Sequence, residues 1–188
     1  MPATDEELMH RFQKGDRTAF ADLVERYRQP AVHFSLRMLH DRDQAEDMAQ
    51  EAFARILLRS GGWTGRARFT TYLFTILKNL CIDELRWRSR WGHSPDYQSL
   101  EAPDTGSSPE AQVVTAEERR LVRTALEQLS PDHKAALLLR EFHGLSYEEV
   151  AGVMGWTDSK TKITIYRARL ALGRVLQAKE GGAADAAR

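Results

Sequence analysis

The densest positive charge in the sequence lies in residues 159–174, SKTKITIYRARLALGR. This segment carries five Lys or Arg residues and no acidic residue, although the whole chain balances 27 basic against 27 acidic side chains. Lys and Arg neutralise phosphates, and side chains at the start of a basic helix can reach base edges in a DNA groove. The segment therefore indicates contact with a polyanion, although a solvated basic surface is the simpler alternative.

A helical wheel at 100° per residue divides this segment into two faces. The face predicted to pack on preceding helices contains Thr161, Ile165, Ala168, Leu172 and Leu176. The opposite face contains Lys160, Ile163, Arg167 and Arg174, flanked by Lys162, Thr164, Tyr166 and Arg169. Ile163 is unusual because it is apolar and points away from its own core. Contact with a thymine methyl group or with a protein partner would each account for it.

The residues before this segment contain the elements needed to position it. Ser146 and Glu149 form a capping box that begins a short helix. Ala151 is small where a second helix must approach, and Gly155 can adopt the left-handed conformation of a tight turn. A second helix then begins near Asp158 or Ser159. This order predicts a helix-turn-helix, whose second helix lies in the DNA major groove.

A second basic segment, residues 66–90, has six basic and two acidic residues and a net charge of +4. Aromatic and basic residues alternate from Trp63 to Trp91, a pattern typical of proteins that bind single strands, because rings stack on unpaired bases while charge follows the backbone. Phe69, Leu73 and Ile76 are expected in the core. Trp63 lies in the glycine-flanked segment GGWTGRARF, which predicts a loop, so we expect it largely outside the core.

Carboxylates and one amide are concentrated at residues 43–51, before both basic segments. Asp43, Glu46, Asp47, Gln50 and Glu51 fall on the polar face of one predicted helix. Paired carboxylates can serve a metal or acid–base site, but no His or Cys lies at ligand spacing nearby, so docking of a basic partner is favoured. The single cysteine, Cys81, lies mid-helix, and the six histidines form no compact motif, so nothing favours an enzyme.

Helical periodicity covers the chain on both sides of residues 91–114, and no hairpin signal occurs. We therefore predict an all-α fold of two small helical bundles. Residues 91–114 hold three of the six prolines, and residues 91–118 carry six acidic and no basic residues, which predicts an acidic flexible linker. The chain has no apolar run long enough to span a membrane and no secretory signal at its start. We expect a cytoplasmic protein without membrane insertion.

The chain resembles a bacterial extracytoplasmic-function (ECF) sigma factor over nearly its whole length. The matching segments are GDRTAFADLVERY, DQAEDMAQEAF, WTGRARFTTYLFTILKN followed by IDELR, LSPDHKAALLLREFHGLSYEEVA, and YRARLAL. The resemblance implies sigma domain two at residues 1–90, the linker at 91–114 and sigma domain four at 115–180. It implies a transcription initiation factor that binds core RNA polymerase and directs it to promoters, with no cofactor, no metal and no catalytic residue of its own.

The resemblance also implies roles for individual residues, and control by an anti-sigma factor, which is common in the family. The residues expected to dock on the clamp helices of the largest polymerase subunit are Asp47, Gln50 and Glu51. The residues expected to open the −10 element and hold a flipped base are Trp63, Thr64, Arg66, Arg68, Tyr72, Lys78, Asn79 and Arg86. The residues expected to read the −35 element as duplex are Ser159, Lys160, Lys162, Ile163, Thr164, Tyr166, Arg167 and Arg169.

The sequence departs from the family pattern mainly in the predicted recognition helix. Relatives commonly open it with a small residue, Thr and Val, whereas this chain has Ser159, Lys160 and Thr161. Trp63 stands where Phe is common, which preserves a stacking face. The alternative is a stand-alone helix-turn-helix regulator whose first module senses a ligand or dimerises. The acidic ridge, formed by the carboxylates and the amide at residues 43–51, and the aromatic and basic loop GGWTGRARF favour a sigma factor instead.

Overall fold

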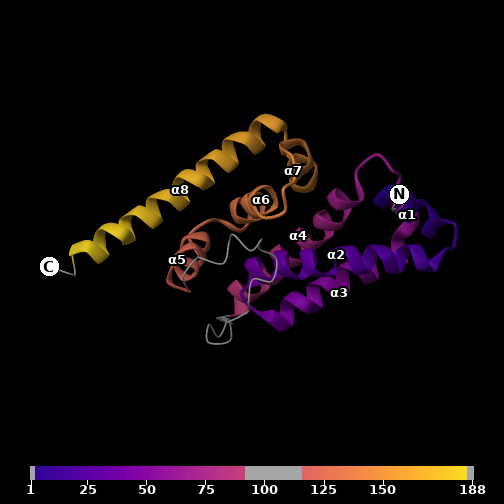
Figure 1. The fold of residues 1–188 in the computed structure, drawn as a ribbon, viewed down its shortest axis with the longest axis horizontal. Helices are drawn as coiled ribbons and strands as arrows, with labels where there is room; N and C mark the ends of the chain where they lie inside the picture. The colour runs from indigo at the N-terminus through magenta and orange to yellow at the C-terminus, as the bar shows by residue number, and fades with distance from the viewer. Residues whose placement is uncertain (1–2, 92–115, 186–188) are drawn as a thin grey trace.

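The computed structural model describes the backbone of residues 3–91 and 116–185 and the side chains of residues 3–91 and 122–174. Within these residues it contains eight α-helices, one short 3-10 helix and no β-strand (Figure 1). The predicted all-α fold is therefore confirmed. The predicted linker, 91–114, lies outside the described residues except for Trp91, which ends a helix.

The first module consists of α1 (Asp5–Gln13), α2 (Arg17–Leu39), α3 (Arg42–Arg59) and α4 (Phe69–Trp91), with η1 (Ser60–Gly62) after α3. Thr4 and Glu7 form the predicted capping box of α1. The turn between α2 and α3 is very short, because His40 ends α2 in the left-handed region (φ 56°) and Asp41 caps α3. Short connections make neighbouring helices antiparallel, so α2 and α3 pack along each other.

The second module consists of α5 (Ala116–Glu127), α6 (Pro131–Glu141), α7 (Tyr147–Met154) and α8 (Asp158–Asp185). Ser130 caps α6 and Pro131 occupies its first position, as predicted. The capping box of Ser146 and Glu149 starts α7, and Gly155 ends it in the left-handed region (φ 67°). The helix-turn-helix is therefore formed by α7 and α8, with the boundaries that the sequence predicted.

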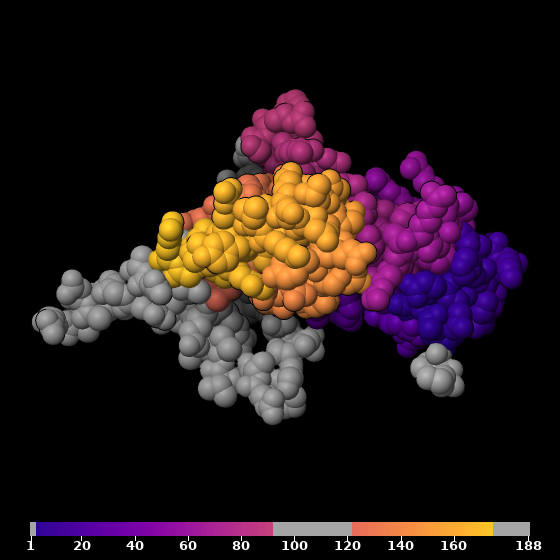
Figure 2. Space-filling model, turned by 90° about the horizontal axis from the view of Figure 1, so that it is seen from above, coloured from indigo at the N-terminus to yellow at the C-terminus, as the bar shows by residue number. Residues whose placement is uncertain are grey.

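The two modules pack against each other, which the sequence did not predict. Helix α7 lies on α4, and α6 lies on α2 and α4. Figure 2 shows the second module, orange to yellow, directly against the magenta part of the first. The α7–α4 contact is closest at Gly152, where an added Cβ would lie 3.1 Å from Thr71 Cγ2.

Polar and aromatic side chains join the two modules. Lys134 Nζ, on the second module, donates to the Met38 carbonyl oxygen at 3.2 Å and lies 2.8 Å from His40 Nε2. The His143 ring packs on the rings of both Phe34 and Phe74, with centroid distances of 5.7 and 4.8 Å. In this interface α6 therefore caps the end of α2, and the loop after α6 extends the core of the first module.

Candidate nucleic-acid and partner interfaces

The basic face of α8 points to solvent, and its apolar face is buried at Thr161, Ile165 and Ala168 and half-buried at Leu172, as the helical wheel predicted. The side chain of Leu176, which the wheel placed on the same face, lies outside the described residues. Thr161 and Ile165 are fully buried, whereas Ile163 and Tyr166 are 51% and 61% exposed. Thr161 occupies a slot that favours an apolar side chain, and its hydroxyl is satisfied because it donates to the Thr157 carbonyl oxygen at 3.0 Å. The other predicted −35 residues that are exposed on this helix are Ser159, Lys160, Lys162, Arg167 and Arg169.

Thr164 is an exception, because it is only 8% exposed and not on the outer face as predicted. On the helical wheel it lies about 60° from Thr161 and about 40° from Ala168, and both of these residues are buried. The predicted outer face was therefore one residue too wide, and Thr164 belongs to the face of α8 that packs on the rest of the protein.

Two cations of α8 already have protein partners in this arrangement. Lys160 Nζ lies 4.6 Å from the centre of the Trp156 ring, which holds it beside the turn. Arg169 Nε donates to Glu141 Oε1 at 3.0 Å, and this bond raises the pKa of the guanidinium. Lys162 and Arg167 are exposed and extend the basic surface between them.

Trp63 is buried, which corrects the expectation that it lies largely outside the core. It is 5% exposed, its Nε1 donates to the Ala67 carbonyl oxygen at 3.1 Å, and its ring packs on His10. The Gln13 amide donates to the carbonyl oxygens of Ser60 and Trp63 at 2.7 and 2.8 Å. These contacts from α1 fold the loop back on the module, so the indole faces inward in this conformation.

The other predicted −10 residues are spread along the loop and α4. Arg68 is exposed but pairs with Glu149 of α7 at 3.1 Å, so the second module reaches into this surface. Lys78 is partly buried, and its burial lowers its pKa. The remaining predicted residues are the exposed Thr64, Arg66, Asn79 and Arg86 and the half-buried Tyr72.

The acidic ridge of α3 is exposed, with Asp47, Gln50 and Glu51 on its outer face. Glu51 accepts from Arg55 Nε at 2.7 Å in an i, i+4 pair, a surface interaction that contributes little to stability. Beside the ridge, α2 and α3 enclose a largely apolar hollow of about 250 Å³. Its lining residues are Val24, Arg28, Val32, Glu46, Ala49, Gln50 and Phe53.

Sequence reasoning missed this hollow because two helices are needed to form it, and neither helix alone carries a signal for it. It also missed the exposed Leu57 and Leu58 at the end of α3, which are 48% and 83% exposed. Their exposure extends the ridge as an apolar surface and suits docking of a protein better than contact with nucleic acid.

Enzymatic chemistry gains no support from the reactive side chains. Cys81 is buried against Ser35, and burial raises the pKa of its thiol to about 12, so the nucleophilic thiolate is not formed at neutral pH. Among the described residues, no three His, Cys, Asp or Glu side chains gather in a way that could hold a metal ion. No helix in the described part of the chain is long and apolar enough to cross a membrane.

A helix-turn-helix with an outward basic face, beside a helical module with an acidic ridge, defines a two-module DNA-binding protein. Residues 23–91 match the family model of Sigma-70 region 2, and residues 119–172 match that of Sigma-70, region 4. The chain therefore belongs to the sigma-70 family of RNA polymerase sigma factors, in its ECF group. Sigma factors are transcription initiation factors, and this one binds core RNA polymerase and directs it to promoters.

Curated relatives share about a third of their residues with this chain along nearly its full length. It is 34% identical to the RNA polymerase sigma-H factor of Pseudomonas aeruginosa over 181 residues, which cover 92% of this chain and 94% of that one. It is also 34% identical to the ECF RNA polymerase sigma-E factor of Escherichia coli K12 over 182 residues, covering 93% of this chain and 95% of that one.

Two solved structures share the fold. CnrH, solved in complex with the cytosolic domain of CnrY, aligns with a TM-score of 0.72 and 22% identity, covering 93% of this chain and 97% of that one. The sigma factor RpoE, solved with the anti-sigma factor NepR from Bartonella quintana, aligns with a TM-score of 0.69 and 23% identity, covering 84% of this chain and 96% of that one.

Proposed function

We propose that this sigma factor uses three separate surfaces. The ridge of Asp47, Gln50 and Glu51 docks on the clamp helices of the largest polymerase subunit. The loop and outer face of α4 bind the opened −10 element, and the outer face of α8 reads the −35 element as duplex. The observation that carries the proposal is α8 itself, a helix whose inner face is buried from Thr161 to Ala168 and whose outer face is exposed and basic.

The proposed division of the chain follows these surfaces: domain two at residues 1–90, a linker at 91–114 and domain four at 115–180. Domain two carries polymerase docking and −10 capture, and domain four carries −35 recognition. The factor has no chemistry of its own in this proposal, because polymerase forms the phosphodiester bonds. It acts in the cytoplasm, where polymerase and promoter are available.

For −10 capture, the buried Trp63 must leave its pocket or act through the loop that it anchors. Extruding a base costs a few kcal/mol of stacking and pairing, which an aromatic and amide surface can offset. Releasing the loop also breaks the two hydrogen bonds from Gln13. We therefore assign Trp63 to base capture only in the promoter-bound state.

We also propose control by an anti-sigma factor. The supporting observations are that both similar structures, CnrH and RpoE, were solved with partner proteins, and that α8 exposes Ile163, Tyr166 and Leu170 along one side. Purifying the tagged chain from its native host, identifying a co-purifying protein and adding it back to a transcription assay tests this. Transcription that is unaffected by every such protein would contradict it.

The docking assignment is tested by replacing Gln50 and Glu51 with Ala and titrating the labelled full chain with bacterial core polymerase. We expect at least about tenfold weaker binding, since residues that anchor an interface cost more than about 1 kcal/mol each when truncated to Ala, and about 1.4 kcal/mol corresponds to tenfold. Asp22→Ala is the matched control, because it removes an exposed acid on α2 that lies on the other side of that helix from Val24 and the hollow. Equal affinity of the double variant and the control would remove the assignment.

A further inference from the structure

One face of α1 contacts the loop before α4, residues 60–68, from its start to its end. Glu6, His10 and Gln13 are spaced i, i+4 and i+7, so at 100° per residue they lie within about 60° of one another on the helix. Figure 1 shows α1 beside this loop, and α1 contacts both η1 and α4. None of the three surfaces of the proposed function includes this face of α1.

Gln13 holds the start of the loop. Its Nε2 donates to the carbonyl oxygens of Ser60 and Trp63 at 2.7 and 2.8 Å, so one amide group uses both of its hydrogens on the loop backbone. Gln13 is the last residue of α1 and is half-buried, which shields these bonds partly from water. The part of the loop that carries Trp63 is therefore tied to α1 by a single side chain.

His10 and Glu6 hold the middle and the end of the loop. The His10 ring packs on the Trp63 ring at a centroid distance of 5.1 Å. A Cβ added to Gly65 would lie 3.6 Å from His10 Nε2 and 3.8 Å from Trp63 Cη2, so the two rings fill the space beside this glycine. Glu6 Oε1 accepts from the Phe69 backbone N–H at 3.2 Å, one of the donors that the start of a helix leaves free. Helix α1 thus follows the whole length of the loop.

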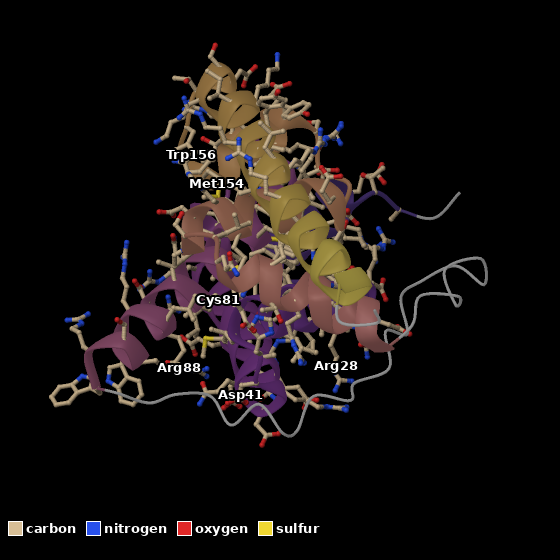
Figure 3. All side chains as sticks on the ribbon, turned by 90° about the vertical axis from the view of Figure 1, so that its left-hand side faces the viewer. Arg28, Asp41, Cys81, Arg88, Met154 and Trp156 are labelled. Atoms are coloured by element: carbon tan, nitrogen blue, oxygen red, sulfur yellow. The ribbon has the colours of Figure 1, made fainter. Side chains whose placement is uncertain are left out.

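The helix after the loop is fixed at its far end. Arg88 donates to the Leu39 carbonyl oxygen at 3.1 Å and lies 3.5 Å from Asp41. Figure 3 shows Arg88 and Asp41 close together, where α4 passes the turn between α2 and α3. Because these contacts lie at the opposite end of α4 from the loop, α4 can stay in place while the loop moves. The position of Trp63 therefore depends on the loop and its contacts.

We propose that Gln13 is a positioning residue for −10 capture, which holds Trp63 inward until the promoter strand is bound. This role rests on the proposed function, in which Trp63 binds a base only in the promoter-bound state. Contacts made only in the inward state lower the population of the outward state, so their removal favours capture. Gln13 has this role because it bonds the Trp63 carbonyl oxygen itself, whereas Glu6 and Arg68 make their contacts at the end of the loop.

The first test measures exchange of the Trp63 indole N–H with solvent by NMR, on the full chain without DNA. This N–H donates to the Ala67 carbonyl oxygen, so it exchanges when the loop opens. Gln13→Leu keeps a helix-favouring side chain but loses both hydrogen bonds, and exchange should be about tenfold faster, which corresponds to about 1.4 kcal/mol. Gln13→Lys keeps a donor at this position and should stay within about threefold of wild type.

Cys81→Ala is the matched control for a general loss of stability. Cys81 is fully buried in the same module, twelve residues after Phe69, which corresponds to about 18 Å along α4. Its truncation lowers the free energy of unfolding without touching the loop, so indole exchange should change less than about twofold. If Cys81→Ala speeds indole exchange as much as Gln13→Leu does, the N–H exchanges only when the whole protein unfolds, and the proposal is wrong. Unchanged exchange in Gln13→Leu overturns it as well.

The second test measures permanganate reactivity of −10 thymines in complexes with core polymerase, at a temperature where the wild-type complex is partly open. The promoter is one that the wild-type chain selects from a library. Gln13→Leu should raise the reactivity, because the released loop captures the strand more readily, and Gln13→Lys should match wild type. Equal or lower reactivity in Gln13→Leu would overturn the proposal, since a residue that only shapes the loop for capture gives a loss.

Failure of this role is distinguishable from failure of the proposed function. Start-site-specific transcription by the wild-type chain with core polymerase reports the proposed function, whatever the variants do. The exchange measurement needs neither polymerase nor promoter, so it reports the tie between Gln13 and the loop even if transcription fails.

Discussion

Acid is expected to destabilise the packed arrangement of the two modules, because two buried histidines at their interface are held neutral. Burial, and then the charge of Lys134, lowers the pKa of His40 to about 3, although Glu127 lies 3.6 Å from its ring. Burial also lowers the pKa of His143 to about 4, with Arg37 adding to the effect. His143 Nε2 has no hydrogen-bond partner, so no acceptor would stabilise the charged ring if Nε2 took up a proton.

The sign of the effect follows from these depressed pKa values. In the unfolded chain a histidine takes up a proton near pH 6.5, whereas the folded chain resists it until about pH 3–4, so stability falls as the pH drops below about 6.5. Proton linkage gives a loss of roughly 2 kcal/mol per histidine between pH 7 and pH 5, or roughly 4 kcal/mol together. That is a large share of the 5–15 kcal/mol that usually stabilises a folded protein.

The assay is urea unfolding followed by far-ultraviolet circular dichroism at pH 7, 6 and 5. His40→Asn is the first variant, since Asn tolerates the left-handed backbone at this position and does not titrate. His143→Phe is the second, since a phenyl ring keeps the contacts with Phe34 and Phe74. Each substitution should remove about half of the pH dependence of the free energy of unfolding. In the double variant, this free energy should be nearly independent of pH between pH 7 and pH 5.

The pH range isolates the histidines from the other perturbed groups. Burial lowers the pKa of Lys134 to about 8, so it stays charged below pH 7 and adds dependence only at higher pH, where stability should rise. A wild-type stability that is flat between pH 7 and pH 5 would refute the reasoning. A pH dependence that survives unchanged in the double variant would refute it as well.

Three further substitutions have defined expectations. Gly152→Ala should loosen the α7–α4 contact, because the added Cβ would lie 3.1 Å from Thr71 Cγ2. Small-angle X-ray scattering should then show a larger radius of gyration, and an unchanged radius of gyration would mean that the Thr71 side chain moves aside. Gly173→Ala, with open space around it, should instead stabilise α8 by about 0.5–1 kcal/mol in urea unfolding. Trp63→Ala should cost roughly 3 kcal/mol in the same assay, as large core truncations do, whereas a loss below about 1 kcal/mol would mean that the ring is not structural.

Most of α8 and its turn could be predicted because the signals are local. A capping box, a left-handed glycine and an apolar stripe each occupy a few consecutive residues, and the structure has all three at Ser146, Gly155 and Ile165. Thr164 was misplaced because the edge of a stripe depends on how closely the neighbouring helices wrap it. Side-chain chemistry does not decide that, since a threonine suits either face.

The position of Trp63 could not be predicted because its contacts are distant in sequence. Gln13 holds the loop from 50 residues away, and His10 covers the ring. Locally, the segment has the glycines of an exposed loop, and periodicity gives no sign that α1 will fold over it. The error therefore concerns tertiary contacts that override a local preference, which is common where loops adjoin a core.

The module interface shows the same limit and also bears on function. Phe34 and Phe74 have the spacing of ordinary core residues, and the sequence could not show that they serve the second module as well as the first. The interface places Glu149 on Arg68 and Gly152 on Thr71, at the start of the helix proposed to bind the −10 element. Promoter elements two helical turns apart are separated by about 70 Å, a span that favours separated modules over modules packed on each other. If the three proposed surfaces act together, we expect promoter binding to break the contacts of Lys134, His143 and Glu149, whereas the exposed ridge on α3 can dock on polymerase before they break.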